Sequence, residues 1–428
     1  MALASPFVGD SIGDAPRLGT ILKSPLTASK WIRKKLDPRK NNPTLPTLPA
    51  KRPRPITPSP SCENLNHMPH PQAAIAESAF FQRLPFEVRR RVLVEAFGEQ
   101  TVHMDLIYDY PLRPPKPRRA SRDAMSHCNM NLYRYGGLDD SRVKVKDSRP
   151  KRYMWRSSVC HRNMPVPGAP GHRVQPSQDL CRFGIVDDAA CDLWPGEYPS
   201  KCFIGAMGWL LTCRQAYVEG IDVLYATNTI HSASKELLYN IDRFLLPQRR
   251  SSINSVELMW EFDAPRLQDR DRNIPFFKEF LEVVPSMFPR VEFLHLAVQW
   301  RTPCPPHGGV PEPSEWEYET MEDIVMRPVD KMVRRLGPRV RECSVAIPST
   351  MYAPRRRRAK EAGEVVEHAC YGGQLERYWR PLGGDSEHHQ GYWVRHGLKD
   401  VAFPYMSPLD EDVMGILGME DWILFHGL

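Results

Sequence analysis

The chain has 428 residues, a formal net charge of +7 and 42 prolines, and proline is about twice as frequent as in an ordinary globular protein. No stretch approaches the roughly 18 consecutive apolar residues of a membrane helix, and the opening residues lack the layout of a signal peptide. These observations argue against membrane, secreted and fibrous proteins. We expect an intracellular protein, nuclear or cytoplasmic, whose ten cysteines are reduced thiols.

Positive charge and proline are concentrated in two segments. Residues 1–79 hold 13 prolines, with 11 Lys or Arg against 5 Asp or Glu, and too little apolar material to offset the entropy of ordering. We predict a disordered, Pro-rich basic tail there, followed by a single domain over 80–428. Residues 111–156 hold 13 Lys or Arg against 4 Asp or Glu and are predicted to be a basic loop inserted into that domain.

The segment FFQRLPFEVRRRVLVEAFG predicts an amphipathic helix. Leu84, Val88, Val92 and Ala96 recur at four-residue steps and should form its apolar face. Pro85 fits the first turn, where its missing N–H costs nothing, and a glycine follows the last turn. TVHMDLIY then alternates as a strand does.

From residue 208 the sequence GWLLTCRQAYVEGIDVLYATN predicts one long helix that ends near Asn228. The residues expected on its buried face are Leu210, Cys213, Tyr217, Ile221 and Leu224. A short strand, TNTIHS, should follow it. SKELLYNIDRFLLP then predicts a further helix, with Ser234 as its N-cap.

Strands and helices alternate from residue 252 onward. SINSVELMWEF predicts a strand with one buried face, PFFKEFLEVVP a helix that stops before Pro285, and VEFLHLAV a strand. TMEDIVMRPVDKMVRRLG predicts a helix capped by Thr320 and Asp323, and ECSVAIP another strand. This order indicates a mixed α/β fold with a small, largely parallel sheet and crossover helices. YAPRRRRAKE is predicted to be a loop, and residues 371–428 to pack irregularly.

No motif of a known chemistry occurs in the chain. GxxxxGK[ST], GxGxxG, GxSxG and HExxH are all absent. We therefore expect no enzymatic activity, no catalytic residue and no cofactor.

Five cysteines fall within 54 residues, accompanied by His161 and His172. Structural zinc is one interpretation, but no C-x2-C or C-x4-C pair is present to hold two thiolates on one tight turn. Buried or loop thiols without a metal are the favoured reading. The cysteines concerned are Cys160, Cys181, Cys191, Cys202 and Cys213.

Two segments resemble known sequences. LPFEVRRRVL looks like the opening helix of an F-box, with Leu84, Pro85, Glu87 and Val88 as the matching residues. LLTCRQAYVEGIDVLYATNT resembles a signature of fungal F-box-like proteins that carry an uncharacterised domain. Its matching residues are Leu211, Cys213, Arg214, Tyr217, Leu224, Tyr225, Asn228 and Thr229.

The resemblance implies F-box-like helices packed on the sheet and a non-enzymatic protein-interaction role. In F-box proteins such a helical module docks on a Skp-type adaptor of a ubiquitin ligase, while the rest of the chain holds a substrate. The residues that the resemblance assigns to partner binding are Leu84, Pro85, Glu87 and Val88. Two alternatives stay open: a nuclear protein whose basic segments bind nucleic acid, and an enzyme of unrecognised type. No membrane partner is expected.

Overall fold

The computed structural model describes residues 45–48, 78–109, 150–162, 176, 179, 202–262, 273–300, 313–367, 376–383 and 390–397. Every helix and strand among the described residues lies in one compact unit, Thr47–Leu428. Most of the predicted tail and insertion therefore falls outside the described residues. Residues 45–48 belong to the predicted disordered tail, yet the backbone N–H of Leu48 donates to the carbonyl of Arg243 (3.0 Å).

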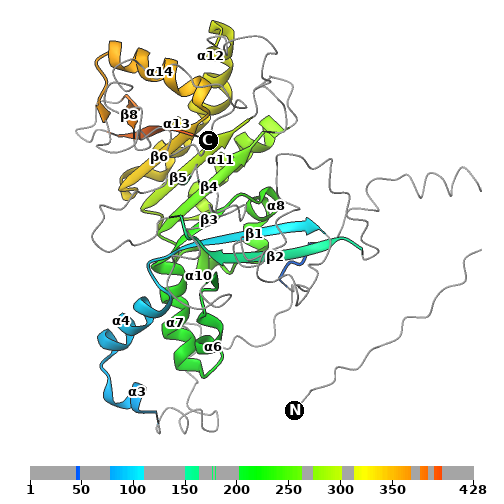
Figure 1. The fold of residues 1–428 in the computed structure, drawn as a ribbon, viewed down its shortest axis with the longest axis vertical. Coiled ribbons are helices and arrows are strands. Elements are labelled where there is room, and N and C mark those ends of the chain that lie inside the picture. The colour runs from blue at the N-terminus through cyan, green and yellow to red at the C-terminus, as the bar shows by residue number, and fades with distance from the viewer. Residues whose placement is uncertain are drawn as a thin grey trace, which may run out of the picture. The chain divides into compact units, whose positions relative to one another are not determined.

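The described strands form one sheet in the order β2-β1-β3-β4-β5-β6-β9-β8-β7, seen in Figure 1. Strands β1, β3, β4, β5, β6 and β9 are mutually parallel. The edge strand β2 is antiparallel to β1, and at the other edge β8 is antiparallel to both β9 and β7. Their bounds are β1 Thr101–Asp109, β2 Arg152–Val159, β3 Thr229–Ser232, β4 Ser255–Glu261, β5 Phe293–Gln299, β6 Glu342–Ile347, β7 Val366–Glu367, β8 Arg377–Pro381 and β9 Gly391–His396.

The predicted mixed α/β fold with a largely parallel sheet is confirmed, but the sheet is larger than expected. It gains β2 from the end of the predicted basic insertion, and β8 and β9 from the segment expected to pack irregularly. The strands predicted for TVHMDLIY, TNTIHS, VEFLHLAV and ECSVAIP are four of the central strands, so those predictions are confirmed.

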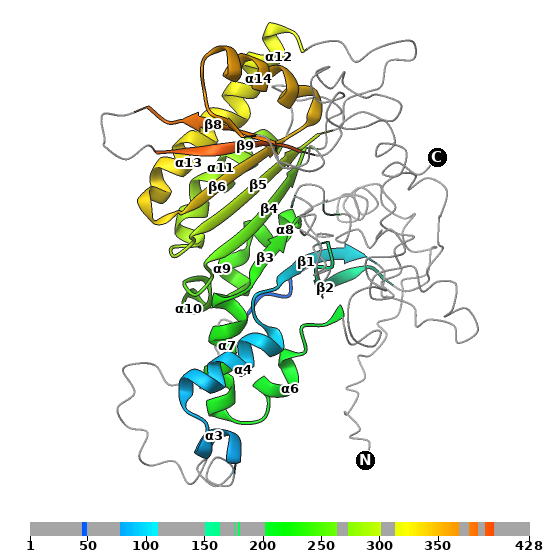
Figure 2. The ribbon, with the colours of Figure 1, turned by 60° about the vertical axis from the view of Figure 1, so that its left-hand side comes forward.

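The main core lies between the central strands and the helices on one side of them, as Figure 2 shows for α11 and α13. Trp260 of β4 is fully buried there and stacks on Phe280 of α11, with ring centroids 5.3 Å apart. The helices concerned are α11 Asn273–Met287, α12 Glu315–Met321, a π-helical turn Glu322–Met326, and α13 Arg327–Leu336.

Two predicted helix boundaries are wrong. The helix expected to stop before Pro285 continues through it to Met287. The helix expected to start at Thr320 begins at Glu315, where the Ser314 side chain accepts from the Glu317 N–H and the Glu317 side chain accepts from the Ser314 N–H. Residues 313 onward thus supply the capping box, and Thr320 lies inside α12.

The arginine run predicted as a loop is a helix, α14 Ser349–Glu361. Three of its four consecutive arginines form ion pairs within the fold. Arg355 pairs with Glu322 (2.9 Å), Arg356 with Glu376 (2.7 Å) and Arg358 with Glu315 (2.9 Å). The helix could not be predicted from the local sequence, because the carboxylates that pair with its arginines come from distant parts of the chain.

The helix predicted over SKELLYNIDRFLLP is divided in two at Asn240, giving α8 Lys235–Tyr239 and α9 Ile241–Phe244, before α10 Pro247–Arg250. Ser234 caps α8 as predicted, because its side chain accepts from the Leu237 N–H. Among the described helices none is both long and apolar enough to cross a membrane.

Four helices form a second, smaller packing unit, here called the helical unit: α3 Ala79–Arg83, α4 Phe86–Phe97, α6 Ala206–Leu210 and α7 Arg214–Ala226. The single long helix predicted from residue 208 is interrupted by a turn at 211–212, after which Cys213 caps α7. The helical unit has its own apolar core, built from Leu93, Phe97, Leu210 and Ile221 among others.

Candidate functional site

The helical unit brings the two sequence signatures together. Arg89 of α4 donates two hydrogen bonds to the carboxylate of Glu219 on α7, at 2.9 and 2.7 Å. Asn228 is fully buried beyond the end of α7 and donates to the carbonyls of Phe97 (2.9 Å) and Leu224 (3.0 Å). Its side-chain oxygen accepts from the Gln100 N–H (2.8 Å). The opening helix and the signature helix are therefore one folded unit despite the long insertion between them.

The face of α4 that packs on α7 differs from the predicted one. Val88 and Val92 are 45% and 44% exposed, and Ala96 is exposed as well. The buried face carries Leu93, Val94 and Phe97, together with Arg89, whose charge is satisfied by Glu219. The prediction failed because an arginine was assigned to solvent, although its ion-pair partner lies 130 residues away.

The residues that the resemblance assigned to partner binding lie at the start of α4. Leu84 is half-buried, and Pro85, Glu87 and Val88 are exposed. Pro85 is the N-cap of α4 and not a residue of its first turn, whereas Glu87 lies in that turn. The Leu84 carbonyl accepts a hydrogen bond from Arg89 (2.7 Å).

The signature residues of α7 mainly build the helical unit. Cys213, Arg214, Tyr217, Leu224 and Tyr225 are all half-buried. The Cys213 sulfur accepts from the Ala216 N–H (3.4 Å) and so takes the place of an oxygen cap. Burial raises the pKa of Tyr225, in keeping with a neutral hydroxyl packed in the unit.

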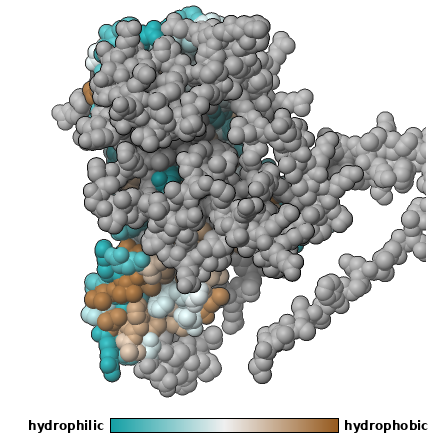
Figure 3. All heavy atoms as spheres, in the orientation of Figure 1, coloured by the Kyte–Doolittle hydropathy of each residue, from teal (hydrophilic) through white to brown (hydrophobic). Residues whose placement is uncertain are grey.

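Apolar side chains remain exposed on the helical unit, and Figure 3 shows apolar surface gathered over this part of the molecule. Val88 and Val92 are one turn apart on α4 and so lie on one face. We call these two valines the α4 stripe. On α6 and the turn after it, Met207 is 63% and Leu211 76% exposed. Exposed apolar surface of this kind marks interaction sites in many proteins.

A second feature lies on the sheet face opposite α11 and α13. One residue from each of the parallel strands β1, β3, β4, β5 and β6 lies in register with the next. We call these five residues the polar row: His103, His231, Glu257, His295 and Ser344. All five are buried. Because side chains alternate along a strand, the apolar residues between them, such as Leu258 and Leu296, face the helical side. SINSVELMWEF was predicted to be a strand with one buried face, but Glu257 and Met259 on its other face are buried as well.

Hydrogen bonds join the polar row to Arg162, which follows β2. Arg162 makes a two-pronged ion pair with Glu257 and also donates to Asp179 (2.8 Å). Glu257 accepts in addition from His231 Nδ1 at 3.1 Å, for which the ring must carry its proton on that nitrogen. At the other end of the row, His295 Nδ1 lies 2.8 Å from Ser344 Oγ.

Burial and ion pairing shift the pKa values of Glu257, His231 and His295 in the polar row. Burial alone would raise the pKa of Glu257, but the charge of Arg162 and the hydrogen bonds from His231 and Arg162 outweigh it and hold the pKa far below its usual value. Burial lowers the pKa of His231, and that of His295 falls to about 3 for the same reason. The row is therefore an ionised Arg–Glu pair flanked by two neutral imidazoles at neutral pH.

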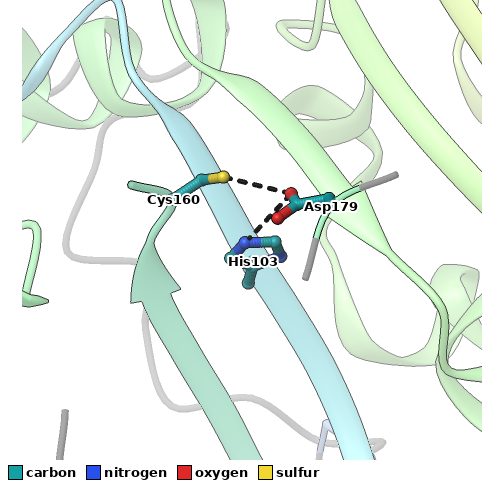
Figure 4. A group of neighbouring side chains, drawn as sticks. All are labelled: His103, Cys160 and Asp179. Atoms are coloured by element: carbon teal, nitrogen blue, oxygen red, sulfur yellow. Dashed lines mark hydrogen bonds and ion pairs between the residues drawn. The ribbon is translucent and has the colours of Figure 1, made fainter. Parts of the chain in front are cut away.

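At the β1 end of the row, a thiol, an imidazole and a carboxylate converge, as Figure 4 shows for His103, Cys160 and Asp179. The Cys160 sulfur lies 3.1 Å and His103 Nε2 3.4 Å from Asp179 Oδ2. All three residues are buried. A Cys, His and Asp set can hold a divalent transition metal, and buried thiol, imidazole and carboxyl groups can also exchange protons.

Sequence reading did not find this group. Cys160 was considered together with its neighbours His161 and Cys202, whereas its contacts come from another strand and from a residue 19 positions further on. Cys181, Cys191 and His172 lie outside the described residues. The one usable signal was a histidine at the third position of each of three strands, β1, β3 and β5.

Comparison with known proteins gives one match. Residues 171–279 match the family model of a domain of unknown function, DUF7730. The matched segment contains α6 to α10, β3 and β4 and enters α11. It supports the expectation of an uncharacterised domain. No curated protein and no solved structure matches the chain.

Proposed function

We propose that this chain is a non-enzymatic protein-interaction protein that docks a partner through the α4 stripe of its helical unit. One observation carries the proposal: Val88 and Val92 are nearly half exposed on a helix whose opposite face is held in place by Arg89, Leu93 and Phe97. A rigid helix that presents apolar side chains in a row is a common recognition surface. Binding a partner would remove these side chains from water.

The partner that the proposal names is a Skp-type adaptor of a ubiquitin ligase. The resemblance of LPFEVRRRVL to the start of an F-box supports that choice, as does the packing of α4 against α7 into one unit. The stripe is bordered by Arg91, whose side chain is 68% exposed. The surface of the partner that contacts the α4 stripe should therefore be apolar, with carboxylates at its rim. The sheet of this chain would be left to hold a substrate.

The nucleic-acid alternative gains no support from the described part of the chain. Arg355, Arg356 and Arg358, the densest basic run there, pair with glutamates from other elements. Paired guanidinium groups would have to give up those carboxylates before they could contact phosphates. The proposal of a protein partner is accordingly the one we carry forward.

The test measures binding of the full chain to a purified Skp-type adaptor by isothermal titration calorimetry. The variants are Val88→Asp and Val92→Asp, which place a charge on an exposed face and so leave the core of the helical unit intact. We expect each to weaken binding by about tenfold or more, the effect of losing about 1.4 kcal/mol at a buried interface position.

Val365→Asp is the matched control, because Val365 is an exposed valine (58%) next to β7, at the opposite end of the strand order from β1. It should bind like the unmutated chain. Absence of binding by the unmutated chain would refute the adaptor proposal. Binding that neither stripe variant weakens would show that the adaptor docks elsewhere.

A further inference from the structure

The structure points to a zinc site that no sequence motif indicates: we propose that His103, Cys160 and Asp179 bind one Zn²⁺ ion. His103 lies on β1, Cys160 directly follows β2, and Asp179 comes from a separate segment. An ion held by all three would fasten that segment to the first two strands of the sheet. This inference is independent of the proposed docking function.

The spacing of the three side chains fits a tetrahedral ion. Zn–S bonds of about 2.3 Å and Zn–N or Zn–O bonds of about 2.0 Å place two ligand atoms about 3.3 to 3.6 Å apart. Asp179 Oδ2 lies 3.1 Å from Cys160 Sγ and 3.4 Å from His103 Nε2. One ligand atom from each residue lies within 4.8 Å of the other two. The two distances to Asp179 Oδ2 are within a few tenths of an ångström of this spacing.

The strand pairing explains why these groups converge without a sequence motif. His103 lies opposite Ser158 in the β1-β2 ladder. Cys160 is two residues beyond Ser158 and therefore projects from the same face of the sheet as His103. The ladder thus supplies two ligands from two strands, where a zinc knuckle would supply them from one turn.

A polar atom without a partner supports the site. Asp179 is 1% exposed, and its Oδ1 atom has no hydrogen-bond partner among the described residues. A buried carboxylate oxygen left without a donor is costly. Zinc held by both carboxylate oxygens would satisfy Oδ1, and Oδ2, from which the ligand spacing is measured, would keep its bond from Arg162 (2.8 Å). A metal-bound carboxylate that also accepts a hydrogen bond is the usual outer-shell arrangement of such sites.

The charges point in the same direction. The buried Asp179 and Glu257 carry two negative charges, against one positive charge on Arg162. By formal charge, these three side chains leave one negative charge without a counter-charge in a dry environment, which is unfavourable. Zn²⁺ together with the thiolate that it requires on Cys160 contributes one net positive charge and closes the balance. The mixture of thiolate, imidazole and carboxylate favours zinc over Mg²⁺ or Ca²⁺, which select oxygen ligands.

The proposal departs from the sequence-based expectation of thiols without metal. The alternative structure of the group is a hydrogen-bonded thiol, in which Cys160 donates to Asp179. Cys160→Ser separates the two. A serine hydroxyl keeps the hydrogen bond to the carboxylate, but it is a poor zinc ligand, so the substitution is tolerated in one case and removes the ion in the other.

The experiment measures zinc in the purified full chain by elemental mass spectrometry, for the unmutated chain, Cys160→Ser and Asp179→Asn. We expect about one ion per chain in the unmutated protein and loss of most of it in both variants. Cys213→Ser is the control, because serine preserves the cap of α7, and it should retain the ion. A chelator should lower the melting temperature of the unmutated chain and leave that of Cys160→Ser unchanged.

Cobalt substitution adds a readout on the unmutated chain, which does not depend on how well any variant folds. Co²⁺ added to the metal-free unmutated chain should produce a thiolate-to-cobalt charge-transfer band, which Cys160→Ser should lack and Cys213→Ser should keep. Absence of zinc and of the cobalt band in the unmutated chain would overturn the proposal. Full zinc content in Cys160→Ser would overturn it as well, by placing the metal on other residues.

Discussion

Arg89 and Glu219 lie 130 residues apart in the chain and form a two-pronged ion pair in which both side chains are about nine-tenths buried. Arg89 also donates to the Leu84 carbonyl, so one guanidinium fixes the turn before α4 and the contact with α7. Burial opposes ionisation of Glu219, but the hydrogen bonds from Arg89 and Gln215 outweigh it and lower the pKa of Glu219. The pair is the polar link that holds the helical unit together.

Glu219→Gln should destabilise the protein by about 3 kcal/mol, because it leaves the Arg89 charge buried without a counter-ion. Arg91→Ala is the control: Arg91 pairs with Glu95 on the surface of the same helix, and its loss should change stability by about 0.5 kcal/mol or less. Urea unfolding followed by circular dichroism measures both. Equal effects of the two substitutions would show that the buried pair contributes no more than a surface pair.

The helices and strands whose periodicity is local could be predicted, and those that depend on distant partners could not. Alternation in TVHMDLIY located β1, and the nearly continuous apolar run of VEFLHLAV located β5, because a strand shows either pattern within eight residues. The run Arg355–Arg358 failed as a helix signal because its carboxylate partners lie on α12, on the π-helical turn after it and just before β8. The buried face of α4 failed for the same reason, through Glu219.

The two candidate sites also differ in how far the local sequence could predict them. LPFEV is a local motif that predicts the start of a helix from the sequence alone. In the structure Val88 of this motif is exposed. The group of His103, Cys160 and Asp179 depends on the β1-β2 register and on the contact between Cys160 and Asp179. No spacing rule can reveal ligands that only a sheet brings together. Buried histidines at equivalent positions of three strands were the one trace of it in the sequence.

The stability of the protein should fall between neutral and acidic pH, partly because of His295. Burial lowers the pKa of His295 to about 3, although Glu257 opposes the shift, while an unfolded chain gives histidine a pKa of about 6.5. Between these values the unfolded state binds a proton that the folded state does not. The free energy of unfolding should therefore drop by about 1.4 kcal/mol per pH unit below pH 6.5 for this residue alone.

His295→Asn should reduce that slope when unfolding is measured at pH 7 and pH 5. Arg395, Arg162 and His231 also act on this imidazole, and all three remain in the variant. Ser344→Ala is the control, because it removes the hydrogen bond to His295 (2.8 Å) but keeps the titrating group and hence the slope. A slope unchanged in His295→Asn would mean that His295 is protonated in the folded state.

Cysteine alkylation should distinguish core thiols from those of the helical unit. Cys343 is 5% exposed, and burial raises the pKa of its thiol to about 12. Thiolate is the reactive form, so Cys343 should resist iodoacetamide in the native protein and react after unfolding. Cys213 is half-buried and should react sooner. Peptide mapping by mass spectrometry measures each site, and native labelling of Cys343 ahead of Cys213 would contradict the packing of β6.

Trp260 is the residue on which we expect the main core to depend most. It is fully buried, stacks on Phe280, and has Phe262, Phe277 and Tyr239 around it. Trp260→Ala should cost about 3 to 5 kcal/mol, since it removes a large apolar surface and leaves a cavity. Trp316→Ala is the matched control, because Trp316 on α12 is 52% exposed.

Trp260→Phe should cost much less than Trp260→Ala, for a reason particular to this site. The indole Nε1–H of Trp260 is buried and has no hydrogen-bond partner among the described residues. Phenylalanine keeps the stack on Phe280 and removes that unsatisfied donor, whose burial costs about 1 to 3 kcal/mol, so this gain offsets much of the lost volume. Chemical denaturation of Trp260→Phe, Trp260→Ala and Trp316→Ala measures the three effects. A loss in Trp260→Phe as large as that in Trp260→Ala would show that the indole N–H is satisfied in the folded protein.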